Sequence, residues 1–371
     1  MTARSVSTGF LIAFALIASV RLAAAQSGGV TSTPPDYPRG RISGYLFGDW
    51  YDNVSGNPRH AYDASGNDSA QTNIDGKNVI GRDLNGFQVR RVYFQLDNDL
   101  SVKYSTRFRL EADGKSLTSD GKIGVAVKAA YMQAREIYPR ADLFFGVIST
   151  PTFENSEDYW GYRAIEKTVA DFRGLAPSAD VGAEVKGFVD GQHILGYSLM
   201  VGDGNGQKPE TNRDKRTYLA VPIHWKDWRV EPYVDYENVF SGKDRATYKV
   251  FAGWDIPHGA LGYEGMEQIG HKPVGNYTEA AANSFFVRWA PKAEWAGFAR
   301  VDFWEPDRNT AARVDQQLWM LGVDWQPMKD VHFMPNLEGM QYDAKGGAVA
   351  PPHHDLQARI TLYWKFTKPQ S

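Results

Sequence analysis

The sequence predicts an all-β fold, a transmembrane antiparallel β-barrel of about sixteen strands. Three observations lead to this prediction. Apolar and polar residues alternate with a period of two from Arg41 almost to the C-terminus. The connections between the alternating segments are short and long in turn, as in an up-and-down meander. No helical segment is available to cover an open sheet, so closure into a barrel is the way to remove its edges.

The stretch SVKYSTRFRLEA shows the alternation most clearly. Lys103, Arg107 and Arg109 share one parity, and Phe108 and Leu110 share the other. A period of two places these sets on opposite faces of a strand. We expect the cationic face to line a water-filled lumen and the apolar face to contact lipid, because a membrane barrel exposes its apolar side to hydrocarbon.

The same pattern recurs along the chain in segments of about nine to thirteen residues, the length that a tilted membrane strand needs. Stretches within these segments are RISGYLFGDWY, RRVYFQLD, ADVGAEVKGF, HILGYSLMV, WRVEPYVDYE, NSFFVRWA, WAGFARVDFW, QQLWMLGVDW and QARITLYWKF. Aromatic residues gather near the segment ends, where a membrane interface would place them. The tryptophans concerned are Trp50, Trp225, Trp228, Trp254, Trp289, Trp295, Trp325 and Trp364.

The connections divide into two classes, which predicts tight turns at one end of the barrel and loops at the other. Very short turns are predicted at 98–99, 139–140, 191–192, 226–227, 257–258, 291–292 and 328–329. Longer polar connections are predicted at 54–84, 113–121, 149–178, 203–215, 239–244, 269–281, 306–313 and 343–354.

The N-terminus has the pattern of a secretory signal peptide, with Arg4, an apolar run over 9–20 and an A-x-A end at Ala25. We therefore expect a signal peptide over 1–25, a flexible lead-in over 26–39, the barrel over 40–366 and a tail over 367–371. The formal net charge of -3 gives no reason to propose a nucleic-acid partner.

Three stretches resemble the phosphate-selective porin family, the O and P type of bacterial outer-membrane porin. They are GFQVRRVYFQLDNDLSVKYSTRFRLEAD, DLFFGVISTPTFENSEDYWGYRAIEK and FRGLAPSADVGAEVKG, and the C-terminal aromatic strand resembles the terminal strand of outer-membrane proteins. The resemblance implies a homotrimeric porin of the bacterial outer membrane, surrounded by lipid and without a cofactor. It also implies passive diffusion of small polar or anionic solutes, with phosphate as a candidate.

The connection 149–178 is the third long loop, which porins fold into the lumen as a constriction. Its sequence is amphipathic and suits a short helix. An ordinary exterior loop is the alternative. The charged residues expected to reach the pore from this loop include Glu154, Asp158, Arg163 and Asp171.

On the barrel wall, the residues expected to line the pore and bind solute are Arg91, Lys103, Arg107 and Arg109. A group of arginines in a narrow lumen attracts anions through its field and through bidentate hydrogen bonds. The alternative is that these residues pair with Glu111 and with the acidic loop, and thereby stiffen the wall. Both interpretations stay open at this stage.

The sequence holds no G-x-S-x-G, P-loop or H-E-x-x-H motif, and neither a catalytic nor a metal-binding group is predicted. Two rival functions are an enzyme built on an outer-membrane barrel and a secreted all-β binding protein. The first needs a nucleophile or an acid pair, which no motif supplies. The second would make the chain soluble without detergent.

Overall fold

The computed structural model describes residues 36–56, 73–74, 77–78, 84–239, 242–271, 277–347 and 353–369. All described helices and strands belong to the unit Tyr37–Ser371. The predicted signal peptide, most of the lead-in and most of the connection 54–84 lie outside the described residues.

The fold is all-β, as predicted. The strands of the main sheet are β1 (Arg39–Ser55), β4 (Asn85–Asp99), β5 (Tyr104–Leu117), β6 (Ile123–Tyr138), β7 (Ala141–Ser149), β8 (Ala179–Phe188), β9 (Gly196–Gly202), β10 (Lys215–Ala220), β11 (Ile223–Trp225), β12 (Trp228–Asn238), β13 (Arg245–Ile256), β14 (Gly259–His271), β15 (Tyr277–Lys292), β16 (Trp295–Glu305), β17 (Arg313–Met328), β18 (Val331–Lys345) and β19 (Asp355–Pro369). A separate two-stranded sheet pairs β2 (Asn73–Ile74) with β3 (Lys77–Asn78).

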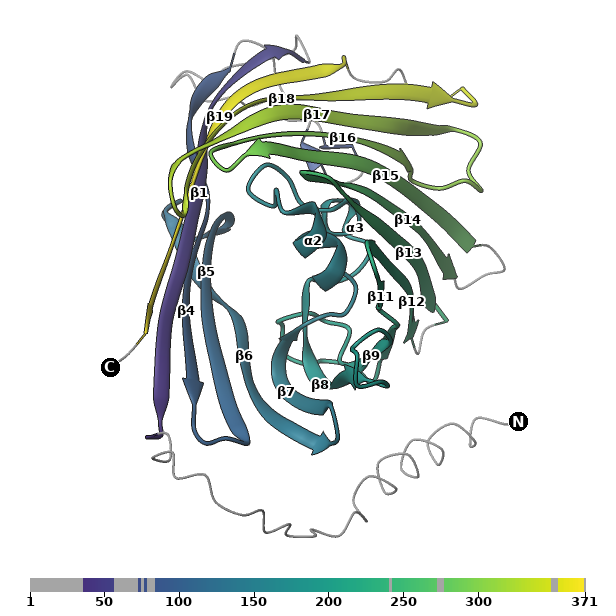
Figure 1. Ribbon diagram of the computed structural model, residues 1–371. Coiled ribbons are helices and arrows are strands. Elements are labelled where there is room, and N and C mark those ends of the chain that lie inside the picture. The colour runs from purple at the N-terminus through teal and green to yellow at the C-terminus, as the bar shows by residue number, and fades with distance from the viewer. Residues whose placement is uncertain are drawn as a thin grey trace, which may run out of the picture. The chain divides into compact units, whose positions relative to one another are not determined.

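The sheet closes into a barrel because β1 pairs antiparallel with both β4 and the last strand, β19. Its 17 described segments count as sixteen strands, since β10 and β11 are two parts of one strand that both pair with β12. Every other strand pairs with its neighbours in chain order. Figure 1 shows the closed wall with two short helices, α2 and α3, inside it. The predicted strand number is confirmed.

The two faces of the wall differ as the alternation predicts. Phe94 and Phe108 are 45% and 41% exposed on the outer surface, whereas Glu111 is 7% exposed on the inner side. Exposure of large apolar side chains on an outer face is unfavourable in water and suits hydrocarbon. No helix among the described residues is long and apolar enough to cross a membrane. The closed sheet and its apolar outer face are those of a transmembrane β-barrel, with lipid around the outer face.

Seven of the eight tryptophans predicted for the interface, all except Trp50, lie near the end of the barrel that carries the short turns. Trp228 lies opposite Trp254 with stacked rings 5.4 Å apart, and Trp295 lies opposite Trp325 with rings 5.9 Å apart. Trp50 lies at the other end, where it pairs with Phe87 next to the long connection 56–84. This arrangement matches the aromatic girdles of membrane barrels, which anchor the wall at the interface.

Several boundaries differ from the sequence prediction. The strands β14 and β15 extend to His271 and Tyr277, so the connection between them is shorter than 269–281. The turn expected at 291–292 lies at 293–294, and β19 continues through the expected tail to Pro369. Ladder hydrogen bonds with a neighbouring strand continue wherever a partner exists, irrespective of side-chain pattern, which is why the pattern alone misplaces strand ends.

The topology makes a testable prediction. Asn98 is the penultimate residue of β4 at the short-turn end, whereas Lys208 is exposed in the long connection 203–214 at the opposite end. Outer-membrane barrels have short periplasmic turns and long external loops. We expect a cysteine at position 208 to react with a membrane-impermeant maleimide on intact cells, and one at position 98 to react only after lysis. The reverse labelling pattern would invert the assigned orientation. Gly204 in the same connection is a poorer site, because its φ of +78° disfavours a side chain.

Candidate functional site

The long connection after β7 folds into the lumen, as predicted. It contains α2 (Glu154–Trp160) and α3 (Val169–Arg173), and each helix ends at a left-handed glycine. Its apolar side chains pack against the wall formed by β13 to β18: the Trp160 ring lies 5.1 Å from that of Phe286 and 6.1 Å from that of Phe298. Trp160 is fully buried, so this loop is a packed part of the barrel interior.

Polar contacts hold the first half of the loop to the wall. The Ser156 hydroxyl donates to Glu264 at 2.9 Å, and the Tyr159 hydroxyl donates to Asp255 at 2.9 Å. The Lys249 ammonium donates to the Thr152 carbonyl oxygen at 2.5 Å. Asp255 is exposed, whereas Ser156, Glu264 and Lys249 are buried, so losing one partner of the buried contacts leaves an unsatisfied group in the other.

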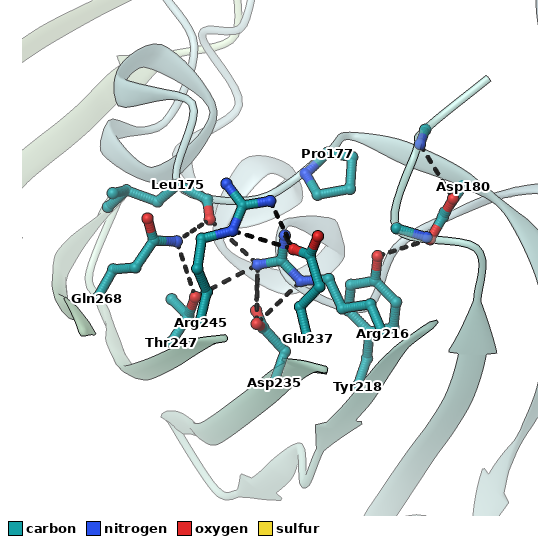
Figure 2. Close-up of polar contacts among 12 residues, drawn as sticks. Leu175, Pro177, Asp180, Arg216, Tyr218, Asp235, Glu237, Arg245, Thr247 and Gln268 are labelled. Carbon is teal, nitrogen blue, oxygen red and sulfur yellow. Dashed lines mark hydrogen bonds and ion pairs between the residues drawn. The ribbon is translucent and has the colours of Figure 1, made fainter. Parts of the chain in front are cut away.

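The end of the loop is held by the cluster shown in Figure 2. Arg216 and Gln268 donate to the Leu175 carbonyl oxygen, at 3.2 and 2.5 Å. Arg216 also donates to Asp235 through Nε at 2.9 Å and Nη2 at 2.8 Å, a bidentate ion pair. The Arg216 side chain is 2% exposed and that of Asp235 is 0% exposed. This buried pair fixes the point at which the chain leaves the lumen and enters β8.

Arg90 provides a further anchor that the sequence analysis missed. The register between β1 and β4 shifts at Phe47, so both Arg90 and Arg91 face the lumen. Arg90 forms an ion pair with Asp49 and donates to the Ile165 carbonyl oxygen at 2.7 Å. Strict alternation assigns Arg90 to the lipid face. A charge in that position was the signal that a bulge interrupts the pattern.

The predicted wall residues lie in different environments. Arg91 forms ion pairs with Glu111 and, at 3.7 Å, with Asp113. Arg107 donates to Asp97 at 2.6 Å, and Arg109 donates to the neutral Gln95 at 2.5 Å. Arg91 thus pairs within its own wall, one of the two arrangements that the sequence left open.

Lys103 differs from the expectation. It lies exposed in the turn that precedes β5, and its carbonyl oxygen accepts the Arg135 amide at 2.8 Å. The turn begins after Asp99, so the strand pattern does not extend back to this residue.

Of the predicted loop residues, Arg163 and Asp171 come together, at 3.5 Å, and Arg163 also pairs with Glu157 at 3.0 Å. Glu154 instead reaches Lys186 on β8, at 3.0 Å. Asp158 is exposed on the lumen side of α2, and no ion pair joins it to another of the described residues. Glu154 and Asp158 therefore lie on the open side of the loop, and Arg163 and Asp171 form an internal pair.

The loop and the opposite wall are electrostatically coupled. Burial raises the pKa of Glu157, while Arg163 on the loop and Lys128 on β6 act against that rise. Arg107 on β5 interacts at longer range with Glu154 on α2. Within the described chain, however, no ion pair joins Arg91, Arg107 or Arg109 directly to a loop carboxylate. These three arginines thus face the loop carboxylates without a direct ion pair, although Lys186 and Arg90 join the same wall to the loop.

Side chains between loop and wall reach water. The side chains of Lys186 and Glu154 are 33% and 42% exposed, and that of Arg107 is 31% exposed, although all three lie inside the barrel. Deeper pairs such as Arg300 and Asp302 are excluded from solvent. The loop therefore fills the side of the lumen that faces β13 to β18, and charged side chains that remain accessible to solvent lie along β4 to β8.

Comparison with known proteins agrees with this architecture. No protein-family model matches the sequence, and neither does any curated protein. Among solved structures, the outer membrane channel DcaP of Acinetobacter baumannii is similar with a TM-score of 0.63, 10% identity and coverage of 88% of this chain and 97% of that one. OmpT of Vibrio cholerae is similar with a TM-score of 0.61 and 11% identity, and the match covers 90% of this chain and 100% of that one. An anion-selective porin from Comamonas acidovorans is similar with a TM-score of 0.61 and 12% identity, and the match covers 89% of this chain and 100% of that one. The chain therefore has the sixteen-stranded barrel fold that bacterial outer-membrane porins share.

Proposed function

We propose that this protein is a porin, a passive channel for small polar or anionic solutes across the outer membrane. The observation that carries the proposal is the set of solvent-accessible charged side chains between the inward loop and the wall of β4 to β8. Such a lumen replaces part of a solute's hydration, and the concentration gradient drives the flux. This function requires no catalytic group and no cofactor.

The arrangement of charge supports a preference for anions, with phosphate as the candidate from the family resemblance. Arg109 faces the lumen, and its hydrogen-bond acceptor among the described residues, Gln95, is neutral. Its charge is therefore available to a passing anion. The anion-selective porin from Comamonas acidovorans has the same fold. A homotrimer remains a prediction from the resemblance.

Planar-bilayer recording tests the channel. Purified, folded protein is expected to produce stepwise current increases in salt solution. If folded protein inserts into the bilayer without producing conductance steps, the porin proposal is wrong. Outer-membrane barrels that are not channels would give that result.

Replacing Arg91, Arg107 and Arg109 together with glutamine is expected to shift the reversal potential in a salt gradient toward cations. The Debye length at physiological salt is about 8 Å, so only ions that pass close to the wall respond to these charges. Lys122→Gln at the exposed tip between β5 and β6 is the control, and it should leave the reversal potential unchanged. An unchanged potential in the triple variant would show that the arginines only brace the wall.

A further inference from the structure

We propose that a cavity beside the end of α2 binds the ammonium group of small organic cations as they pass through the lumen. This inference rests on the proposed channel function. The cavity has a volume of about 260 Å³ and lies between the loop and strands β1, β17, β18 and β19. Its lining includes Tyr45, Asp158, Tyr162, Asp324, His332 and Tyr363.

The lining of the cavity is acidic. It contains Glu157, Asp158 and Asp324, and the only guanidinium in the lining belongs to Arg163. Arg163 is shared by Glu157 at 3.0 Å and Asp171 at 3.5 Å, which neutralises its charge. Within the lining, negative charge therefore remains at Asp158 and Asp324; Arg229 and Lys186 outside the lining act on Asp158, and a small cation in the cavity would add to that compensation.

The two remaining carboxylates differ in how they are held. Asp324 accepts hydrogen bonds from His332 Nδ1, at 2.9 and 3.0 Å to its two oxygens, and it interacts with the Tyr162 hydroxyl. Burial and Asp324 raise the pKa of Tyr162, which therefore stays a hydrogen-bond donor. Asp158 projects into the lumen without an ion pair to another described residue. The Asp324 carboxylate is thus held in place by its hydrogen bonds at one end of the cavity, and the Asp158 carboxylate can contact a ligand.

Aromatic rings form much of the remaining surface. Tyr45 and Tyr363 have ring centroids 6.0 Å apart, and Tyr162 belongs to the same lining. Several tyrosine faces next to carboxylates are the chemistry by which proteins bind ammonium groups, through cation–π attraction and charge. A purely acidic site would suit a metal ion, but the rings favour a cation that carries alkyl groups.

The size of the cavity restricts the ligand further. Drug-sized ligands occupy pockets of about 300–1,000 Å³, so this cavity suits a smaller molecule. Choline is a suitable probe because it is small and permanently charged. Its uncharged isostere, in which carbon replaces the nitrogen, has the same shape and serves as the control ligand.

The experiment records single channels while choline or its isostere is added to one side. Choline is expected to produce transient current interruptions that give a binding constant, and the isostere should produce none. Asp158→Asn and Tyr162→Leu should each weaken choline binding by roughly fivefold, which matches the strength of one partly exposed charge or ring contact. Tyr162→Phe, which keeps the ring face, should bind choline far better than Tyr162→Leu.

The matched control for the charge is Asp343→Asn. Asp343 is an exposed carboxylate on β18, near the end of the barrel that carries the long connections, and it pairs with Lys345. It should leave choline binding unchanged. If choline and its isostere interrupt the current equally, or if Asp343→Asn weakens choline binding as much as Asp158→Asn, the proposal of an ammonium site is wrong. The proposal of a channel would be unaffected by that result. Absence of any wild-type conductance would instead overturn the channel proposal itself.

Discussion

Arg216→Ala is expected to lower the free energy of unfolding of the barrel by about 3–5 kcal/mol, because it leaves the buried Asp235 carboxylate without its cation. Asp235 has 0% side-chain exposure and receives two hydrogen bonds from Arg216. Glu237 lies 3.6 Å from the same guanidinium, and the Leu175 carbonyl oxygen loses a donor. Unfolding in urea, followed by tryptophan fluorescence in lipid vesicles, measures the change.

The same substitution should also alter the current. The end of the inward loop is held at Leu175 by Arg216 and Gln268, so losing one of the two donors should increase current noise as the loop moves. The double variant Arg216→Met with Asp235→Leu should recover much of the stability, because a buried pair replaced by apolar residues costs less than a broken pair. If Arg216→Ala is as stable as the wild-type protein, water must solvate the Asp235 carboxylate when Arg216 is absent.

Phe108→Arg is expected to cost about 2–4 kcal/mol, the penalty for a cation on the lipid face near the bilayer midplane. Phe108 is 41% exposed on the outer surface and lies four residues into β5. With a rise of about 3.4 Å per residue and a tilt of about 40°, it stands roughly 10 Å from the short-turn end of the strand. That height is well inside an apolar band of about 25 Å.

The neighbouring residue provides the comparison. Arg107 points into the lumen, where it donates to Asp97 at 2.6 Å and remains 31% exposed. Arg107→Phe should therefore change conductance more than stability. Folding titrations in vesicles compare the two variants directly. Should Arg107→Phe prove the more destabilising of the two, the assignment of faces on β5 would be reversed.

Much of the fold could be predicted because a membrane barrel depends on a local rule. Lipid outside and water inside impose alternation on every strand, and closure removes edges that lipid could not solvate. The parity of Phe108 and Arg107 and the number of strands follow from that rule. The inward course of the third loop was predicted by resemblance, with amphipathicity in support.

The details of the site could not be predicted in the same way. Alternation misassigned Arg90, because a bulge changes the direction of a side chain and only a charge at a lipid-facing position marked it in the sequence. The sequence also left the partners of Arg91 open, since ion pairing depends on which strands lie side by side. Arg216 and Leu175 are 41 residues apart, and only the folded loop brings the guanidinium to that carbonyl oxygen.

The sequence by itself therefore determined the barrel fold, which side chains face lipid or lumen, and the polar character of the lumen. It could do so because each strand contacts lipid on one side and water on the other. Tertiary structure alone decided which charges remain available to a solute. Glu111 neutralises Arg91, whereas Arg109 contacts only the neutral Gln95 among its described hydrogen-bond partners, and Asp158 stays on the open side of the loop. The physical reason is that electrostatic interactions depend on distance in space, which period-two patterning does not encode.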